Sequence, residues 1–306
     1  MPCSTHLLLD EFVRALTGKS AATVETYHRE LCHLLAWIAE RPGHGGGFHP
    51  EQLTRTALET YLAHLESQGH SLSHRARVKS AVAMFARWLI EDKSLLQRNP
   101  ARGISLPPQA LLAPRELSPD QRYVLRGLVE RRSDPRGEAL FALGYWAGCR
   151  VSDVAWLRIE DVHVGPKVGW VHAGHKAGKA RDIDLINEAR RALYAYLREG
   201  GRDPESAYVF TSQRAARLTE AGIHHWLRTL KAEASKDEWE LIREVTFHDL
   251  RHDFAHRARA AGWSLEEVAY YLGHVTHKGT PAIQTTARYT QVSRDRVREK
   301  LRLLRG

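Results

Sequence analysis

Residues 247–254 read FHDLRHDF and place two reactive side chains on one face of a helix. His248 and Arg251 are three residues apart, so a helix carries them about one turn apart on the same side. Such a helix presents a proton acceptor and a phosphate-binding guanidinium together. The apolar positions, which predict a face that packs into a core, are Phe247, Leu250 and Phe254.

Further reactive side chains stand in order on both sides of this stretch. They are Arg150 in AGCRVSDVAWL, Lys176 in HKAGKAR, His274 in LGH and Tyr289 in ARYTQV. Two guanidiniums suit bidentate binding of the non-bridging oxygens of a phosphate, and a lysine can protonate a leaving alkoxide. Histidines can donate to the phosphate or accept a phenolic proton, and a tyrosine can hold the phosphate covalently. The set predicts attack by a phenol on a DNA phosphodiester.

Residues next to these side chains are expected to support them. Asp153, three residues after Arg150, is predicted to reach back to its guanidinium or to a neighbouring amide. His252 is predicted to be a packed, hydrogen-bonded histidine beneath the site. Lys179 and Arg181 are expected to contact the DNA backbone. For Lys179 the alternatives are a structural contact and a role as the acid, and for Arg181 the alternative is a position on the surface of the sheet.

Two other tyrosines compete with Tyr289 for the role of nucleophile. Tyr270 and Tyr271 lie in an amphipathic helix and are expected to pack, whereas Tyr289 lies in the polar segment TTARYTQ. We therefore assign the nucleophile to Tyr289.

A zinc site is an alternative interpretation of FHDLRHDF, because His248 and His252 have the spacing of two ligands on a helix. The metalloprotease pattern has Glu directly after the first His, but Asp249 stands there and no clear third ligand follows. We expect no metal.

The composition favours a polyanionic partner. The chain has 306 residues, 43% apolar residues, a net charge of +9 and an isoelectric point near 9.6, which permits two modest cores and suggests nucleic-acid binding. The three cysteines cannot all pair, which favours a reducing compartment. The start MPCSTHLLLDEF predicts neither a signal peptide nor a membrane span, so we expect a cytoplasmic, nucleoid-associated protein.

The N-terminal part is predicted to be a helical DNA clamp. Residues 6–93 show four helical patterns with polar or glycine-rich breaks. The last of these, about residues 71–92, has no acid before position 91, a composition typical of a surface that releases counterions on duplex DNA. A solvated charged face is the alternative. The expected phosphate-binding residues are Arg75, Arg77, Lys79 and Arg87.

The rest of the chain predicts a mixed α+β domain. NPARGISLPPQALLAP, residues 99–114, is proline-rich and predicts a linker between domains 1–98 and 115–306. A helix starts at Ser118, where SPDQ supplies a cap, and short alternating runs over 161–185 predict a small antiparallel sheet with Lys176 at a hairpin turn. Further helices are expected near 138–148, 187–199, 219–233, 248–261, 264–272 and 293–304, with an exposed connection over 234–245.

These motifs resemble the tyrosine recombinase (phage integrase) family, near its Xer-like branch. GCRVSD is similar to the family's G-x-R-x-S-E, FHDLRH to H-x-L-R-H, and LGH and the late Tyr-Thr-x-Val complete the order. The sequence departs from the family pattern at Ala147 for Thr, Asp153 for Glu, Ala177 for Gly, and in a longer segment between His274 and Tyr289.

The resemblance implies an all-α, SAM-like core-binding bundle followed by an α+β catalytic domain that is mostly helical with a small antiparallel sheet. It implies a site-specific recombinase or integrase that acts through a 3′-phosphotyrosyl intermediate and a Holliday junction, in integration or excision, cointegrate resolution or dimer resolution. The implied assembly is a homotetramer on two double-stranded DNA sites, formed from monomers or weak oligomers, with an accessory protein possible and no cofactor needed. A non-catalytic DNA-binding regulator and a metal-dependent phosphoesterase are the alternatives.

Overall fold

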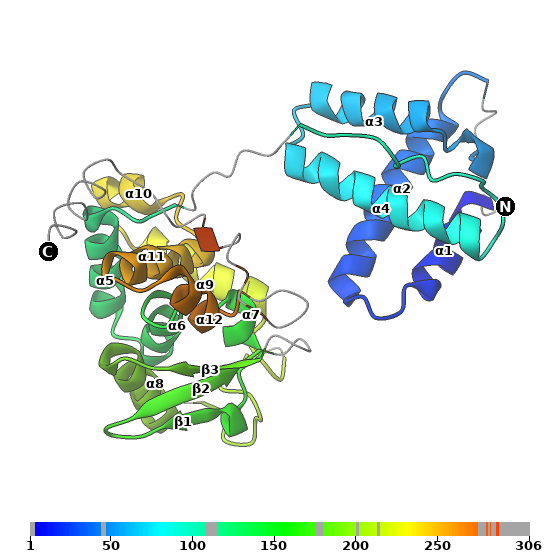
Figure 1. Cartoon of the computed structure of the whole chain (residues 1–306). Coiled ribbons are helices and arrows are strands. Elements are labelled where there is room, and N and C mark those ends of the chain that lie inside the picture. Colours follow the sequence, from blue (N-terminus) through cyan, green and yellow to red (C-terminus); the bar gives the residue numbers. More distant parts are fainter. Residues whose placement is uncertain are drawn as a thin grey trace, which may run out of the picture. The chain divides into compact units, whose positions relative to one another are not determined.

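The computed structural model describes residues 4–43, 47–107, 115–174, 180–199, 202–212, 215–274, 280, 282 and 286–287. It divides into two compact units, Met1–Ala110 and Leu111–Gly306 (Figure 1). Within the described ranges, no helix has the length and apolar character needed to cross a bilayer.

The first unit is a helical bundle, as the sequence predicted. It consists of α1 (Ser4–Ala15), α2 (Ala21–Ala39), a short 3-10 turn (Pro50–Gln52), α3 (Arg55–Ser67) and α4 (Leu72–Glu91). Hydroxyl side chains that accept hydrogen bonds from the first turn cap three of the helices: Ser20 for α2, Thr54 for α3 and Ser71 for α4. One face of α4 is apolar and fully buried, at Val78, Val82, Phe85 and Leu89.

Residues 99–107 pack against this bundle, although the sequence assigned them to the linker. Ala101 and Ile104 are buried with its core. The Asn99 side chain donates to the Ala83 carbonyl at 2.9 Å, and Lys79 donates to the carbonyl of Ile104. The described half of the expected linker therefore belongs to the first unit, and residues 108–114 lie outside the described ranges.

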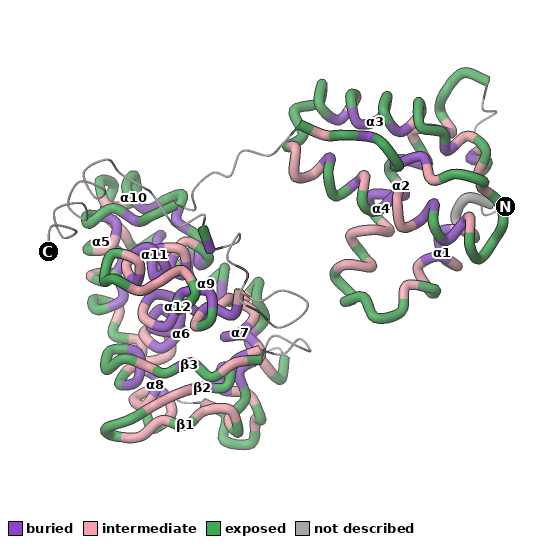
Figure 2. Tube along the Cα trace, in the orientation of Figure 1, coloured by how far each residue is buried: buried purple, intermediate pink, exposed green. Residues whose placement is uncertain are grey.

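The second unit surrounds a small sheet with helices. Its helices are α5 (Pro119–Arg132), α6 (Pro135–Tyr145), α7 (Val151–Ala155), α8 (Asn187–Glu199), α9 (Glu220–Ala232), α10 (Lys236–Ile242), α11 (Phe247–Ala260) and α12 (Leu265–Leu272). Figure 2 shows that buried segments gather in α6, α11 and α12. The predicted cap at Ser118 is present, with the side chain of Gln121 closing the capping box.

The antiparallel sheet is β1 (Val162–Val164), β2 (Gly169–Ala173) and β3 (Arg181–Asp184), in that order. Its register pairs Val162 with Val171 and Ala173 with Arg181. Helix α8 lies against the sheet (Figure 1). The hairpin between β2 and β3 includes residues 175–179, which lie outside the described ranges.

Two predictions about helices were wrong in position or kind. The expected helix over 138–148 is α6 at 135–145, because Asp134 caps it and Pro135 begins it. The expected exposed connection over 234–245 contains α10, where Ser235 and Glu238 form a capping box and Ile242 is fully buried. Local capping chemistry thus decided both starts.

A buried carboxylate fastens α11 to the start of the second unit. Asp253 is completely buried, and its Oδ1 accepts from the Leu117 amide at 3.1 Å and from Arg122 Nε at 2.9 Å. Its Oδ2 accepts from Arg257 Nε at 2.9 Å. This paired charge satisfies the requirement for a buried carboxylate and fixes the helix that carries His248 and Arg251.

Candidate active site

Arg150 reaches the site from a tight turn after α6. Gly148 in that turn has φ +61°, and a Cβ there would stand 2.8 Å from Phe254 Cδ1, so the turn requires glycine. Arg150 is the N-cap residue of α7. The chain thereby leaves a buried helix and exposes the next side chain at the surface of the core.

Asp153 holds this turn as predicted. Its Oδ2 accepts from the Arg150 amide at 3.1 Å and lies 3.9 Å from Arg150 Nη1. The same oxygen accepts from Arg181 Nη2 at 3.0 Å. Because the Asp153 side chain is 5% exposed, its charge is compensated inside the protein.

Arg251 is buried at the centre of the cluster. Its Nη1 donates to the Gly148 carbonyl at 2.6 Å, and its Nη2 donates to the Leu272 carbonyl at 2.7 Å. Nη2 also lies 3.0 Å from His274 Nε2. Both hydrogens of Nη2 are therefore used within the protein, which differs from the bidentate phosphate clamp expected for this residue.

Arg150 and His274 meet Arg251 at the end of α12. Arg150 Nη2 donates to the Gly273 carbonyl at 2.8 Å, and 28% of the Arg150 side chain is exposed. Arg251 is only 1% exposed. The structure thus brings the three predicted residues together and makes Arg150 the more accessible guanidinium.

His274 is held at both ring nitrogens. A guanidinium can only donate, so His274 Nε2 accepts from Arg251, and the proton lies on Nδ1, 3.1 Å from Thr286 Oγ1. Thr286 is completely buried. Sequence reasoning missed Thr286, because a threonine in a polar segment gives no signal of its burial.

The histidines of the site are held in the neutral form. Burial and then the Arg251 charge lower the pKa of His274 to about 3. Burial and the neighbouring His248 lower the pKa of His252 to about 4, and the two rings lie 4.1 Å apart in an edge-to-face arrangement. Desolvation and the Arg251 charge also lower the pKa of His248, although its side chain is exposed. Exposed and neutral, His248 is suited to accept a proton.

Asp249, which stands where the zinc metalloprotease pattern has Glu, has a structural role. Asp249 forms a capping box with Thr246 at the start of α11, and its Oδ2 accepts from the Thr246 amide at 2.7 Å. Among the residues that the structure describes, no group of His, Cys, Asp or Glu has the arrangement of a metal site.

The tyrosines differ in their surroundings. Tyr271 packs as predicted, and its hydroxyl donates to the Asp184 carbonyl at 2.9 Å. Tyr270 is 76% exposed, so the prediction that it packs was wrong: its position on α12 faces solvent. Tyr289 and Lys176 lie outside the described residues, as does Lys179.

Helix α4 exposes only part of its predicted basic set. Arg75 is buried and forms an ion pair with Glu66 at 2.8 Å. Lys79 is bound to the Ile104 carbonyl. Arg77 and Arg87 are exposed. Arg75 and Lys79 therefore make structural contacts within the first unit, and their DNA-binding role stays a prediction.

Arg181 is also largely buried. Only 10% of its side chain is exposed, and it donates to Asp153 and to the Tyr271 carbonyl. The contacts described for Arg181 are therefore internal to the site, and a contact with the DNA backbone stays a prediction.

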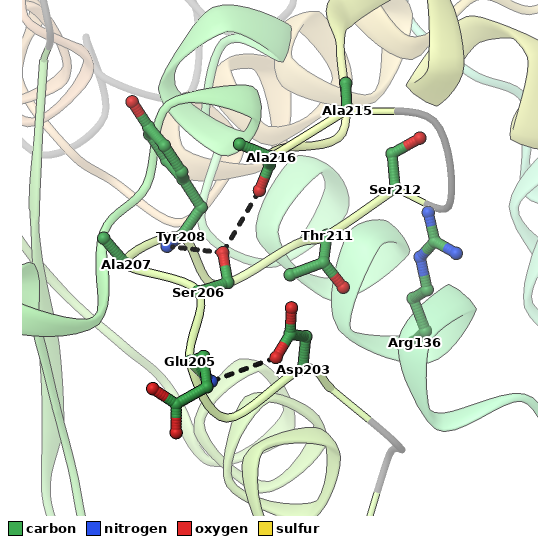
Figure 3. A pocket seen from close by; sticks show the side chains of 10 residues that line it. All are labelled: Arg136, Asp203, Glu205, Ser206, Ala207, Tyr208, Thr211, Ser212, Ala215 and Ala216. Carbon is green, nitrogen blue, oxygen red and sulfur yellow. Dashed lines mark hydrogen bonds between the residues drawn. The ribbon is translucent and has the colours of Figure 1, made fainter.

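A cavity of about 700 Å³ lies apart from this cluster and shares no residue with it. Figure 3 shows Arg136 from α6 opposite the loop that carries Asp203 and Ser206. Asp203 accepts from the Glu205 amide at 3.0 Å, and Ser206 donates to the Ala216 carbonyl at 3.1 Å. These polar groups stabilise the loop and do not form an arrangement of nucleophile and base.

Comparison with known proteins places both units among related sequences. Residues 121–296 match the model of the phage integrase family, and residues 8–94 match that of the phage integrase N-terminal SAM-like domain. The tyrosine recombinase XerC of Rhodospirillum centenum is 32% identical over 288 residues, which cover 90% of this chain and 79% of the relative. XerC of Neisseria gonorrhoeae is 29% identical, and the match covers 94% of this chain and 90% of the relative.

Solved structures share the fold. The Tn1549 transposon integrase in complex with transposon right end DNA has a TM-score of 0.74 at 16% identity and covers 99% of each chain. The XerH site-specific recombinase bound to difH has a TM-score of 0.70 at 17% identity, with 97% of this chain and 84% of that chain covered.

Proposed function

Because the chain belongs to the phage integrase family, we propose that it is a site-specific recombinase that cuts and rejoins double-stranded DNA through a covalent tyrosine intermediate. The observation that carries this proposal is the convergence of Arg150, Arg251 and His274 on the Gly148 turn and the end of α12, with His248 on the same helix as Arg251. A phosphate placed at the exposed edge of this cluster would meet a guanidinium and a neutral imidazole.

The proposed cleavage transfers one phosphoryl group. The phenolic oxygen of Tyr289 attacks phosphorus while the bond from phosphorus to the 5′ oxygen breaks. Lys176 gives a proton to the departing 5′ oxygen, and the neutral His248 accepts the phenolic proton. The products are a 3′-phosphotyrosyl bond and a free 5′-hydroxyl, and rejoining is the reverse reaction with a 5′-hydroxyl from the partner strand.

The arginines stabilise the negative charge that develops on the phosphorane. Arg150, as the more exposed guanidinium, is placed to bind a non-bridging oxygen. Arg251 contributes its charge from the interior and holds the two turns that frame the pocket. His274 orients Arg251, and a direct contact from His274 to phosphate would require that hydrogen bond to open.

The partner that we propose is duplex DNA, bound by a homotetramer that brings two sites together. Solved relatives with this fold are bound to DNA. The phosphotyrosyl bond conserves the energy of the phosphodiester, so the scheme requires no nucleotide and no metal. The proposed location is the cytoplasm, with the DNA.

The test is a covalent adduct. Purified protein is incubated with duplex DNA from the sequence flanking its own gene, and protein–DNA species that survive denaturation are counted. Wild type is expected to form a 3′-linked adduct in the presence of a chelator, whereas Tyr289→Phe binds the same duplex and forms none. Tyr270→Phe and Tyr271→Phe are the matched controls and retain the adduct. An adduct in Tyr289→Phe would assign the nucleophile elsewhere, and no adduct with any protein would favour a non-catalytic DNA-binding regulator.

A further inference from the structure

Arg181 occupies the junction of three parts of the site. It is the first residue of β3, and in the sequence it lies two residues after Lys179 and five residues after Lys176. Its Nη2 donates to Asp153 Oδ2 at 3.0 Å, and its Nε donates to the Tyr271 carbonyl at 2.8 Å. One side chain thus connects β3 with α7 and α12.

Both partners of Arg181 also define the position of Arg150. Asp153 accepts from the Arg150 amide through the same oxygen that binds Arg181. The Tyr271 carbonyl lies two residues before Gly273, whose carbonyl accepts from Arg150. A shift of Arg181 would therefore move β3 relative to the phosphate-binding arginine.

The surroundings of Arg181 carry a cost in free energy, because they bury a polar group without fully satisfying it. Its Nη1 is buried and has no hydrogen-bond partner among the described residues. The guanidinium also packs closely against Gly273, where an added Cβ would stand 2.8 Å from Arg181 Cδ. Native proteins rarely leave such a donor unsatisfied, and the exceptions concentrate where geometry serves function.

We propose that Arg181 is a positioning residue that fixes the start of β3, and with it the end of the sequence segment that carries Lys176, against the Arg150 pocket. The upstream end is fixed by the pairing of Ala173 in β2 with Arg181 in β3. The described residues on both sides of the segment that carries Lys176 are thus anchored, and the proposed consequence is that Lys176 delivers its proton to the departing 5′ oxygen. This role rests on the proposed function of Lys176 as the general acid.

A direct contact from Arg181 to the DNA backbone is the competing assignment, and it makes a different prediction. A phosphate contact releases counterions, so its loss weakens binding and reduces the salt dependence of affinity. A positioning residue whose donors bind protein groups leaves both unchanged and affects only the step that its partner performs.

The experiment compares Arg181→Ala with Lys176→Ala on two substrates. Each is a duplex on which wild type forms an adduct, with oxygen or with sulfur at the 5′-bridging position of the cleaved phosphate. A thiolate leaves without protonation, so the sulfur substrate rescues a defect in proton donation. Arg181→Ala is expected to bind with wild-type affinity and salt dependence, to cleave the oxygen substrate at least about 10-fold more slowly, and to recover on the sulfur substrate to within about threefold.

Arg190 supplies the matched control. It is also a buried arginine, and its Nη1 donates to the Gly165 carbonyl at 2.7 Å in the turn between β1 and β2. Arg190→Ala should lower thermal stability as Arg181→Ala does, yet cleave the oxygen substrate at a near-normal rate per folded molecule. Arg181→Lys, which keeps the charge and one donor group, gives a second measurement of the same rescue if the alanine variant does not fold.

Three results would overturn the proposal. Equal slowing on both substrates would assign Arg181 to phosphate stabilisation or to folding, and weaker binding with a smaller salt dependence would assign it to the DNA backbone. If the sulfur substrate rescues Lys176→Ala but neither Arg181 variant, the positioning role of Arg181 is refuted while the acid role of Lys176 stands. If sulfur rescues neither Lys176→Ala nor the Arg181 variants, the acid assignment of Lys176 fails and the positioning role fails with it.

Discussion

Arg251 Nη2 donates a hydrogen bond to His274 Nε2 at 3.0 Å, and this contact determines which nitrogen of the imidazole carries the proton. With its proton on Nδ1, His274 donates to Thr286 Oγ1, which in turn donates to the Ala282 carbonyl at 3.3 Å. The low pKa of His274, about 3, keeps this chain in the same state at neutral pH. The buried arginine is therefore oriented by a neutral ring, which does not repel the guanidinium charge.

Lysine should not replace either arginine. Lys at position 251 retains charge but cannot bind the carbonyls of Gly148 and Leu272 and the His274 ring together, and Lys at 150 loses the planar fork. We expect single-turnover adduct formation to fall by about 100-fold or more for Arg150→Lys and for Arg251→Lys, by analogy with the loss of one oxyanion donor. Arg190→Lys, at a buried arginine outside the site, is the control. Near-normal cleavage by both site variants would be incompatible with these roles.

Stability should fall as the pH is lowered, and His274 should contribute to that slope. Its pKa is about 3 in the folded protein and near 6.5 when unfolded, so the unfolded chain binds the extra proton between these values. Its contribution is complete above pH 6.5 and is lost toward pH 3, at up to about 1.4 kcal/mol per pH unit. Urea unfolding between pH 7.5 and 4.5 should give a shallower profile for His274→Asn. Parallel profiles would mean that His274 titrates normally in the fold.

The arginines of α4 are expected to fall into two groups, one that contributes to DNA affinity and one that contributes to stability. We expect Arg77→Ala with Arg87→Ala to reduce the slope of log affinity against log salt by about 2, because each exposed arginine displaces about one counterion. Arg75→Met should instead lower Tm with little change in that slope, because it removes the ion pair with Glu66. Fluorescence anisotropy across a salt series measures the first effect and thermal unfolding the second. The reverse pattern would place Arg75 in the DNA-binding set.

The C-terminal segment should act between protomers. Residues 293–306 contain Val297, Leu301 and Leu304 at helical spacing among basic residues, and they lie outside the described structure. We expect their deletion to leave binding to a single DNA site nearly unchanged and to weaken the tetrameric complex and recombination. Sedimentation of the protein–DNA complexes separates these species. If the shortened monomer loses its fold while the full chain keeps it, the segment packs on its own protomer.

The sequence predicted the helical bundle and the mixed second unit because helical periodicity and strand alternation depend on local spacing. The gathering of Arg150, Arg251 and His274 was expected from the chemistry of the set and from the family resemblance. Sequence reasoning failed where a side chain's role depends on burial. The sequence pattern predicted Arg75 and Arg181 to be surface cations, yet both side chains are largely buried and each pairs with a carboxylate, Glu66 for Arg75 and the buried Asp153 for Arg181. Thr286 was not predicted as a site residue because its role depends on a contact with His274, which lies 12 residues earlier in the chain. Helix α10 was not predicted, although Ser235 and Glu238 have the sequence spacing of a capping box.

The guanidiniums of the site rest on main-chain oxygens, those of Gly148, Leu272 and Gly273. A carbonyl acceptor is present whatever side chain stands at its position, so exchange of Leu272 for another apolar residue alters packing without deleting a partner of Arg251. The arginine contacts depend instead on the backbone conformation of two glycines, Gly148 with φ of +61° and Gly273 with φ of +63°. The protein can therefore vary the side chains around its pocket while it keeps the arginine geometry, and a single methyl group at position 148 or 273 would disturb that geometry more than the loss of a neighbouring side chain.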